Sequence, residues 1–204
     1  MESSGIQRLF YVLWMIIKLN LYFVLFSLMG GILLGVGPAF QTMNDLLVEH
    51  GLNYQEITFK KFLAGWKMNF KRGNQHFLLF FGIISLLGYN LYLSVQIQGL
   101  MWLVIDFALF FTILLVSVLF IYVTLYQTSY DISLLNVVKL AFVSVFLNFG
   151  TFLKILFGVV SILFITWLFK GLVLFATFAL LIIWSGYATK ESRTLVERKL
   201  AAHG

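Results

Sequence analysis

The chain contains no cysteine, a single proline and few charged residues among its 204 positions. The absence of cysteine excludes disulfides, thiolate metal sites and cysteine nucleophiles. Charged residues make up 11% of the chain, whereas they make up about a quarter of an average soluble domain. One proline and 16 scattered glycines leave long stretches without helix breakers. These shortages favour long helices in apolar surroundings over a loop-rich or disulfide-linked fold.

Apolar side chains dominate what remains. Hydrophobic residues account for 61% of the chain, and phenylalanine alone occurs 23 times. A soluble fold of this length could not bury so much apolar surface, so the lipid bilayer is the expected solvent. The net charge of +6 would suggest a nucleic-acid partner in a soluble protein. No nucleic-acid-binding fold signal accompanies it here, and basic residues suit cytoplasmic loops beside anionic headgroups, so we expect no nucleic-acid partner.

The hydrophobic runs predict an all-α, polytopic membrane protein that forms one integral domain. The first run is too long for the core of a signal peptide and ends in no small-residue cleavage site, so we expect it to be retained. Only residues 96–98 separate the second and third runs, which predicts an antiparallel hairpin. Five transmembrane helices are expected, at residues 12–34, 75–95, 99–126, 151–168 and 172–186.

The polar segments between these runs favour helices at the membrane surface. The first span is expected to end in a turn at Gly35, Gly37 and Pro38. The glycines allow a bend or a close helix contact, and the proline suits the first residue of a new helix. Interfacial helices are expected at residues 38–50, 57–72 and 132–149, and a charged, helical tail is expected at residues 189–204.

Residues 57–72 give the clearest amphipathic pattern. Aromatic residues recur on one face at helical spacing, and lysines cover the other face. Such a helix either lies in the membrane interface, where it packs and anchors, or docks on a partner. Anchoring is the more ordinary of these two interpretations. The residues that we expect to meet lipid or a partner are Lys60, Lys61, Phe62, Trp66, Lys67 and Phe70.

A faint tandem repeat runs through the chain. Residues 77–87 resemble residues 153–163, with a Phe-Gly pair at the same place in both. Each run follows a surface helix and precedes a second span. The expected plan is therefore one span and then two copies of surface helix, span and span. Both copies would share one orientation, unlike the inverted repeats of many transporters.

Basic residues are unevenly divided between the two sides that this plan defines. Most lysines and arginines follow the first, third and fifth spans, whereas the other side carries Arg8 and Lys170. Positive residues are retained on the cytoplasmic side. We therefore expect the N-terminus outside, and the surface helices and the C-terminus in the cytoplasm.

Two charged residues fall inside expected spans. Lys18 and Asp106 each lie about two turns from the outer face, and a charge in a span costs roughly 2.5–3.5 kcal/mol on insertion scales. Their matching depth predicts that they pair. Asn20 and Asn90 lie near the same depth. The four residues form either a polar pocket for a ligand hydroxyl or an ion, or a structural ion pair that fixes the first span against the third; the second interpretation is the more ordinary.

The sequence carries no catalytic signature. Its three histidines lack metal-ligand spacing, and it has neither a glycine-rich phosphate loop nor a Gly-x-Ser-x-Gly motif. Asp106 is the only acid in any expected span, which argues against hydrolysis by paired carboxylates and against a relay of several acids. We expect no enzyme activity, no cofactor and no metal site.

Several short motifs resemble the YesL family of bacterial integral membrane proteins. The first span ends in Gly-Val-Gly-Pro-Ala at residues 35–39, Thr-Phe-Lys-Lys-Phe follows at residues 58–62, and Phe-Lys-Arg-Gly-Asn at residues 70–74. Size and element order extend the resemblance over nearly the whole chain. Many members carry Pro-x-x-Thr at the end of the first span, whereas Met-Gly-Gly stands here at residues 29–31, as in the glycine-rich branch. The family has no established catalytic residues.

The resemblance implies a bacterial plasma membrane and a place beside carbohydrate uptake, especially ABC-type sugar importers. The expected function is therefore that of an accessory subunit that docks by a helix on the permease subunits of such an importer. A small standalone transporter or channel, single or oligomeric, is the alternative, and it requires Lys18 or Asp106 for flux. A membrane enzyme is disfavoured because the polar residues assemble no nucleophile and base.

Overall fold

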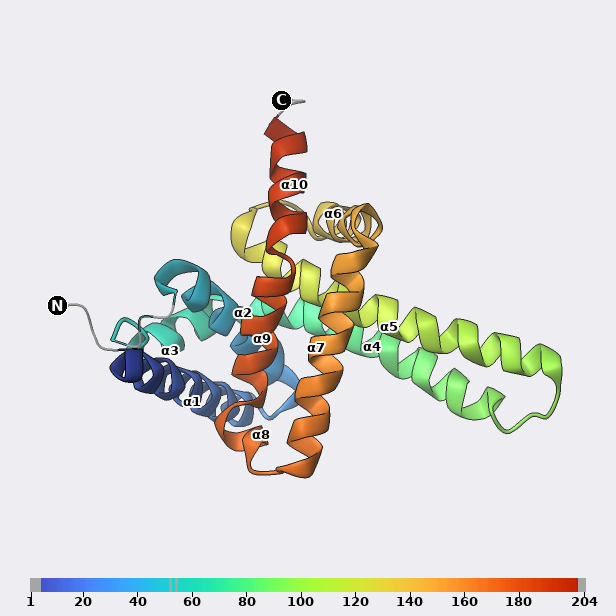
Figure 1. The fold of residues 1–204 in the computed structure, drawn as a ribbon, viewed down its shortest axis with the longest axis horizontal. Coiled ribbons are helices and arrows are strands. Elements are labelled where there is room, and N and C mark those ends of the chain that lie inside the picture. Colours follow the sequence, from blue (N-terminus) through green and yellow to red (C-terminus); the bar gives the residue numbers. More distant parts are fainter. Residues whose placement is uncertain (1–4, 52, 54, 202–204) are drawn as a thin grey trace.

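The computed structural model describes residues 5–51, 53 and 55–201, and within them the chain consists of helices joined by short turns and loops, without a strand (Figure 1). Apolar runs uninterrupted by proline, with few glycines, explain the length of the principal helices. In chain order the helices are α1 (Gly5–Met29), α2 (Leu33–His50), α3 (Phe59–Met68), α4 (Phe70–Ser94), α5 (Leu100–Ser129), α6 (Leu134–Leu147), α7 (Phe149–Leu168), α8 (Leu172–Phe175), α9 (Thr177–Ala188) and α10 (Lys190–Ala201).

Four of these helices, α1, α4, α5 and α7, are long and apolar enough to cross a membrane. They confirm the predicted polytopic helical membrane protein. Helices α4 and α5 form the expected antiparallel hairpin, which projects at the right of Figure 1. Helices α1 and α4 begin earlier than the hydrophobic runs suggest, because polar residues such as Arg8 and Asn74 continue the helices beyond their apolar sections.

The predicted fifth span at residues 172–186 is not one continuous helix. It is divided at Ala176, whose φ of −149° and ψ of −30° interrupt the helix between α8 and α9. Helix α9 has 12 residues, which reach about 18 Å and fall short of the roughly 30 Å hydrocarbon core. Hydrophobicity alone could not reveal this break, because the residues on both sides of it are apolar.

The predicted turn at Gly35, Gly37 and Pro38 lies instead at residues 30–32. Gly31 and Ile32 have positive φ angles of 68° and 64° there, and only the glycine adopts such an angle without strain. Helix α2 then begins at Leu33 and contains Pro38 in its interior. The prediction placed the turn too late because it took the proline as the first residue of the new helix.

The structure has helices at the positions predicted for the surface helices, with different ends. The predicted helix at residues 57–72 divides at Asn69, which ends α3 and precedes α4. The predicted helix at residues 132–149 corresponds to α6. Helix α10 covers the predicted tail from Lys190 to Ala201, and residues 202–204 lie outside the described part of the chain.

The order of elements follows the tandem plan. A short helix and two apolar segments occur as α3, α4 and α5, and again as α6, α7 and the α8–α9 pair. An Asn-Phe pair lies at each junction between the short helix and the first apolar helix, at Asn69 and at Asn148. The Asn148 side chain accepts a hydrogen bond from the Thr151 N–H at 3.1 Å. The separation along the chain between the two Asn-Phe junctions differs from the separation between the two matched apolar runs. The two halves therefore share the order of their elements, but their sequences do not align without a gap.

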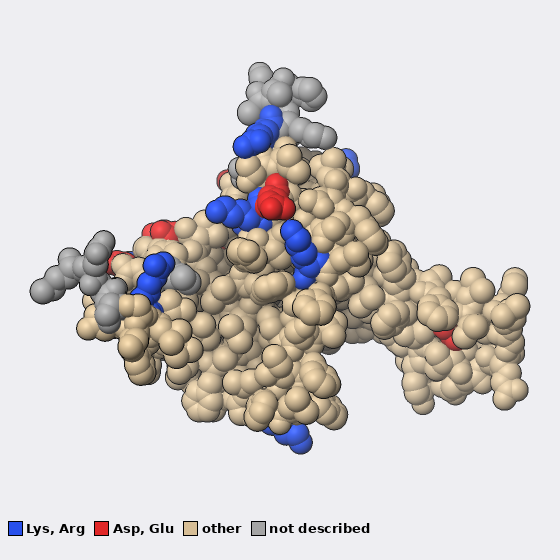
Figure 2. Space-filling view, in the orientation of Figure 1, with Lys and Arg blue, Asp and Glu red and all other residues tan. Residues whose placement is uncertain are grey.

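Two groups of buried side chains hold the helices together. One joins α5, α6 and α7 around Tyr122, Tyr126 and Phe152. The other joins α1, α2, α3 and α9 around Phe26 and Phe62. The α4–α5 hairpin extends past both groups. In Figure 2, charged side chains gather over α10, α6 and the α3 region, whereas the hairpin carries almost none, as expected of a surface that faces lipid.

Candidate functional site

The structure does not pair Lys18 with Asp106. The Asp106 carboxylate accepts a hydrogen bond from the Ser94 hydroxyl, across the α4–α5 hairpin. Lys18 lies on α1, which packs on α2, α3, α8 and α9, and no ion pair joins it to Asp106. The prediction assumed that the two helices run side by side, so that equal depth means contact. In the structure, the α4–α5 hairpin projects away from α1 and from the helices that contact α1 (Figure 1).

Asn20 and Asn90 are also apart. The Asn20 side chain is fully buried, and its Oδ1 accepts hydrogen bonds from the backbone N–H groups of Phe178 at 2.8 Å and Ala179 at 3.2 Å. Its Nδ2 donates to the Val173 carbonyl at 2.9 Å. Asn90 is exposed and bonds only the Leu86 carbonyl of its own helix. The predicted outer pocket is therefore not formed. Asn20 instead caps the N-terminus of α9, where the N-cap residue Ala176 makes no side-chain hydrogen bond.

The glycines near Pro38 form a helix contact rather than a hinge. A Cβ atom on Gly37 would lie 2.6 Å from the Gly73 carbonyl oxygen, and one on Gly73 would lie 2.8 Å from the Cα atom of Pro38. Helices α2 and α4 therefore approach closely at this point, as small residues allow in membrane proteins. Gly35 is similarly close to the backbone of Ser27 in α1.

The aromatic face of α3 packs on the chain itself. Phe62 is fully buried, and its ring stacks on that of Phe26 in α1 at a centroid distance of 5.0 Å. The Trp66 ring lies 5.8 Å from Phe26 and 5.1 Å from Phe70, and its Nε1 donates to the Gly35 carbonyl at 3.4 Å. Phe62 and Trp66 anchor α3 to the chain itself, whereas Phe70, the first residue of α4, stays exposed.

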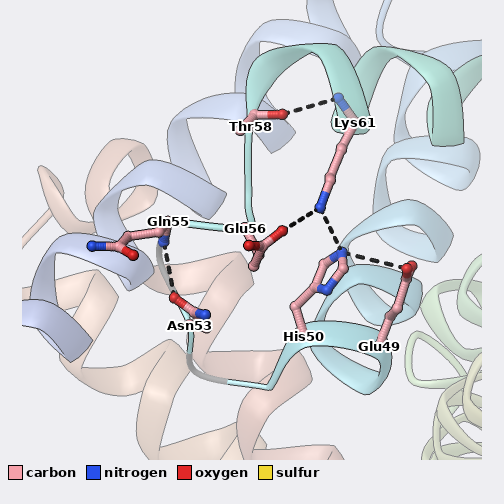
Figure 3. Close-up of polar contacts among 7 residues, drawn as sticks. All are labelled: Glu49, His50, Asn53, Gln55, Glu56, Thr58 and Lys61. Atoms are coloured by element: carbon pink, nitrogen blue, oxygen red, sulfur yellow. Dashed lines mark hydrogen bonds and ion pairs between the residues drawn. The ribbon is translucent and has the colours of Figure 1, made fainter.

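The lysines of α3 divide into two kinds. Lys60 and Lys67 are exposed and point away from the fold. Lys61 turns back to the loop before α3, where its Nζ lies 2.6 Å from a Glu56 carboxylate oxygen and 3.3 Å from the His50 ring (Figure 3). The hydrogen bond and the charge of Lys61 lower the pKa of Glu56 below its ordinary value.

A polar network that the sequence analysis missed joins α2, α5 and the α3–α4 junction. Asp45 lies at its centre. One carboxylate oxygen accepts from Gln41 at 3.0 Å and from Thr128 at 2.5 Å, and the other accepts from Asn69 at 2.7 Å. Asn44 donates to the same Thr128 hydroxyl at 2.6 Å. The sequence signal was the polar residues in the helix predicted at residues 38–50, which we placed at the membrane surface rather than against a neighbouring span.

A cleft of about 360 Å³ lies beside this network, and Asp45, Asn69, Arg72 and Gln127 contribute to its walls. Arg72 is held by the α5–α6 connection, with its guanidinium 3.2 Å from Asp131. Gln127 is 6% exposed, and neither of its amide atoms has a hydrogen-bond partner. The His76 ring is its neighbour, although no hydrogen bond of ordinary geometry joins them. The cleft therefore presents an amide that an incoming polar group could satisfy.

The groups at this cleft are mainly hydrogen-bonding side chains. Within the described part of the chain, no group of three or more His, Asp or Glu residues could hold a metal ion. The Asp45 carboxylate is fully engaged by amide and hydroxyl donors, so it is poorly placed to act as a base. Amides, a hydroxyl and balanced charges can hold a neutral polar molecule or stabilise the helix junction.

Comparison with known proteins concerns the first part of the chain. Residues 16–91 match the family described as "Protein of unknown function, DUF624". The match extends from the middle of α1 almost to the end of α4, and it includes the α2–α4 contact, α3 and most of the Asp45 network. No curated protein and no solved structure matches the chain.

Proposed function

We propose that this chain is a non-catalytic membrane subunit that docks on the permease subunits of an ABC-type carbohydrate importer. The observation that carries the proposal is the division of α3 into an inward aromatic face and an outward cationic face. Phe62 and Trp66 fix the helix to α1, while Lys60 and Lys67 stay exposed. A basic face held rigidly in this way suits an acidic surface on a partner.

The carbohydrate part of the proposal comes from the resemblance to the YesL family. The match over residues 16–91 to a family of unknown function is compatible with that resemblance and adds no activity of its own. We place the protein in the bacterial plasma membrane, with its N-terminus outside and with α3 and α10 in the cytoplasm. The excess of basic residues on those segments supports this orientation.

Site-specific photo-crosslinking tests the docking face. A photoreactive amino acid at position 67 should give a crosslinked product with a permease subunit in cells of the native host. The matched control is position 170, an exposed lysine between α7 and α8 that lies on the other side in the proposed topology. Equal crosslinking from both positions, or products formed with lipid alone at position 67, would contradict docking through α3.

A standalone transporter remains the second candidate, and the cleft beside Asp45 is the observation in its favour. The cleft is polar, has a volume of about 360 Å³ and lies between helices. Because Lys18 and Asp106 are not brought together, Asp45 is the residue to change first. Transport by the purified chain in liposomes, lost in Asp45→Asn and retained in Glu191→Gln outside the cleft, would favour this candidate over the docking subunit.

A further inference from the structure

A cavity of about 490 Å³ lies between α2, α5, α9 and α10. Its volume falls in the range of roughly 300–1,000 Å³ that is typical of small-molecule sites. Lys190 and Arg193 contribute to its walls, and no acidic residue does so within the described part of the chain. One end of the cavity is therefore positively charged.

The guanidinium of Arg193 is incompletely satisfied. Its side chain is half-buried, one Nη donates to the Gly186 carbonyl at 3.3 Å, and its buried Nε has no hydrogen-bond partner. Among the described side chains, neither Arg193 nor Lys190 belongs to an ion pair, since Glu191 of the same helix pairs with Lys154 at 3.6 Å. A half-buried cation without a counter-ion is unfavourable, so this site favours an anion.

The rest of the cavity wall is largely apolar. Leu47 of α2, Leu125 of α5, and Ile182 and Ile183 of α9 contribute to it. A gap of only about 10 Å³ behind Leu125 and Ile182 separates this cavity from a second, more apolar one of about 280 Å³. The cavity therefore places an apolar wall beside two cations, which suits an amphiphile better than a free ion.

We propose that this cavity binds one anionic phospholipid. Its phosphate lies at Lys190 and Arg193, and the first part of one acyl chain lies against Leu125 and Ile182. A free phosphate would satisfy the cations and leave the apolar part unfilled. A neutral lipid would fill the apolar part and leave Arg193 without a counter-ion. Only an amphiphile with an anionic head matches both ends, and this inference does not depend on the docking function.

Native mass spectrometry of the purified full-length chain tests this assignment. The protein is delipidated in mild detergent and titrated with phosphatidylglycerol or with phosphatidylcholine that has the same acyl chains. We expect one phosphatidylglycerol to bind more tightly than any further lipid and more tightly than phosphatidylcholine. Inorganic phosphate in large excess should leave this lipid bound. Displacement by inorganic phosphate, or equal binding of the two lipids, would overturn the proposal.

Two sets of variants, each with a matched control, locate the site. Each surface cation contributes about 1 kcal/mol near an anionic lipid, so Lys190→Gln and Arg193→Gln should each weaken phosphatidylglycerol binding about fivefold, and both together about thirtyfold. Lys67→Gln, which removes an exposed lysine outside the cavity, is the matched control. Gly186→Leu fills part of the cavity and should also weaken binding, whereas Gly82→Leu on the exposed face of α4 should not. Unchanged affinity in the double variant or in Gly186→Leu would overturn the proposal.

Discussion

The side chain of Asn20 in α1 caps helix α9, 158 positions further along the chain, by accepting a hydrogen bond from the backbone N–H of Phe178 at 2.8 Å. Ala176, at the N-cap position of α9, has no side chain that could do so. An uncapped helix end in an apolar environment leaves its first N–H groups unsatisfied. Asn20 therefore makes the break between α8 and α9 possible and joins the first and last apolar parts of the chain.

Replacing Asn20 by alanine should lower the free energy of unfolding by about 2 to 4 kcal/mol, because it leaves buried groups at Val173, Phe178 and Ala179 without partners. Denaturant or thermal unfolding in detergent measures the change. Asn90→Ala is the matched control and should change stability by less than about 0.5 kcal/mol, since Asn90 is exposed on α4. Similar losses in the two variants would show that the cap contributes little.

The α2–α4 contact predicts opposite effects of one substitution at two glycines of the same helix. Gly73→Ala should destabilise the protein by about 1 to 3 kcal/mol, because its Cβ would lie 2.8 Å from the Cα of Pro38. Gly82→Ala should leave stability unchanged or raise it by up to about 1 kcal/mol, since nothing lies within 4 Å of a Cβ there. Unfolding of the two variants under the same conditions tests the contact, and equal effects would argue against it.

The network around Asp45 predicts that a change of charge without a change of shape is harmful. In Asp45→Asn, one acceptor oxygen becomes an N–H₂ group that must face Asn69 or the Gln41–Thr128 pair, all of which donate to the present carboxylate. We expect a loss of about 1 to 3 kcal/mol in unfolding free energy. Glu49→Gln, at an exposed position on the same helix, should have little effect. A stability of Asp45→Asn equal to that of the wild type would mean that the network is dispensable.

The loop before α3 predicts a pH dependence. The hydrogen bond and charge of Lys61 hold the pKa of Glu56 below its ordinary value, so the Glu56–Lys61 contact stabilises the loop above the unfolded-state pKa and is lost as the pH falls through the folded-state pKa. Carboxyl-carbon NMR titration measures the pKa of Glu56. Lys61→Met should raise it toward the ordinary value, whereas Lys60→Met should leave it lowered. An unchanged pKa in Lys61→Met would refute the assigned cause.

The fold class followed from the sequence because apolar length and helical periodicity are local properties. The spacing of Phe62 and Trp66 likewise indicated the aromatic face of α3, although both side chains pack on Phe26 rather than on lipid or a partner. The pairing of Lys18 with Asp106 failed because depth along two helices says nothing of how the helices cross. Helix directions are set by contacts such as Gly37 against Gly73, which involve residues far apart in the chain.

The role of Asn20 was equally hidden. A single asparagine within an apolar run suggests a group that binds a ligand. In the structure, its partners include backbone N–H groups at the start of α9, and the hydrophobic pattern gave no sign that a helix begins there. The Asp45 network was missed because residues 38–50 were predicted to form a helix at the membrane surface. Polar residues on a short amphipathic helix can equally face a neighbouring span, and the sequence contains no sign that distinguishes the two arrangements.

The central claim, docking through the cationic face of α3, is tested most directly by a mild-detergent pull-down of the tagged protein from its native host grown on several sugars. We predict that the wild type recovers the permease subunits of a carbohydrate importer, that Lys170→Glu does so equally, and that the Lys60→Glu, Lys67→Glu double variant loses them while remaining folded. Recovery of the chain alone, or equal recovery of the permease subunits with the double variant, would contradict the claim.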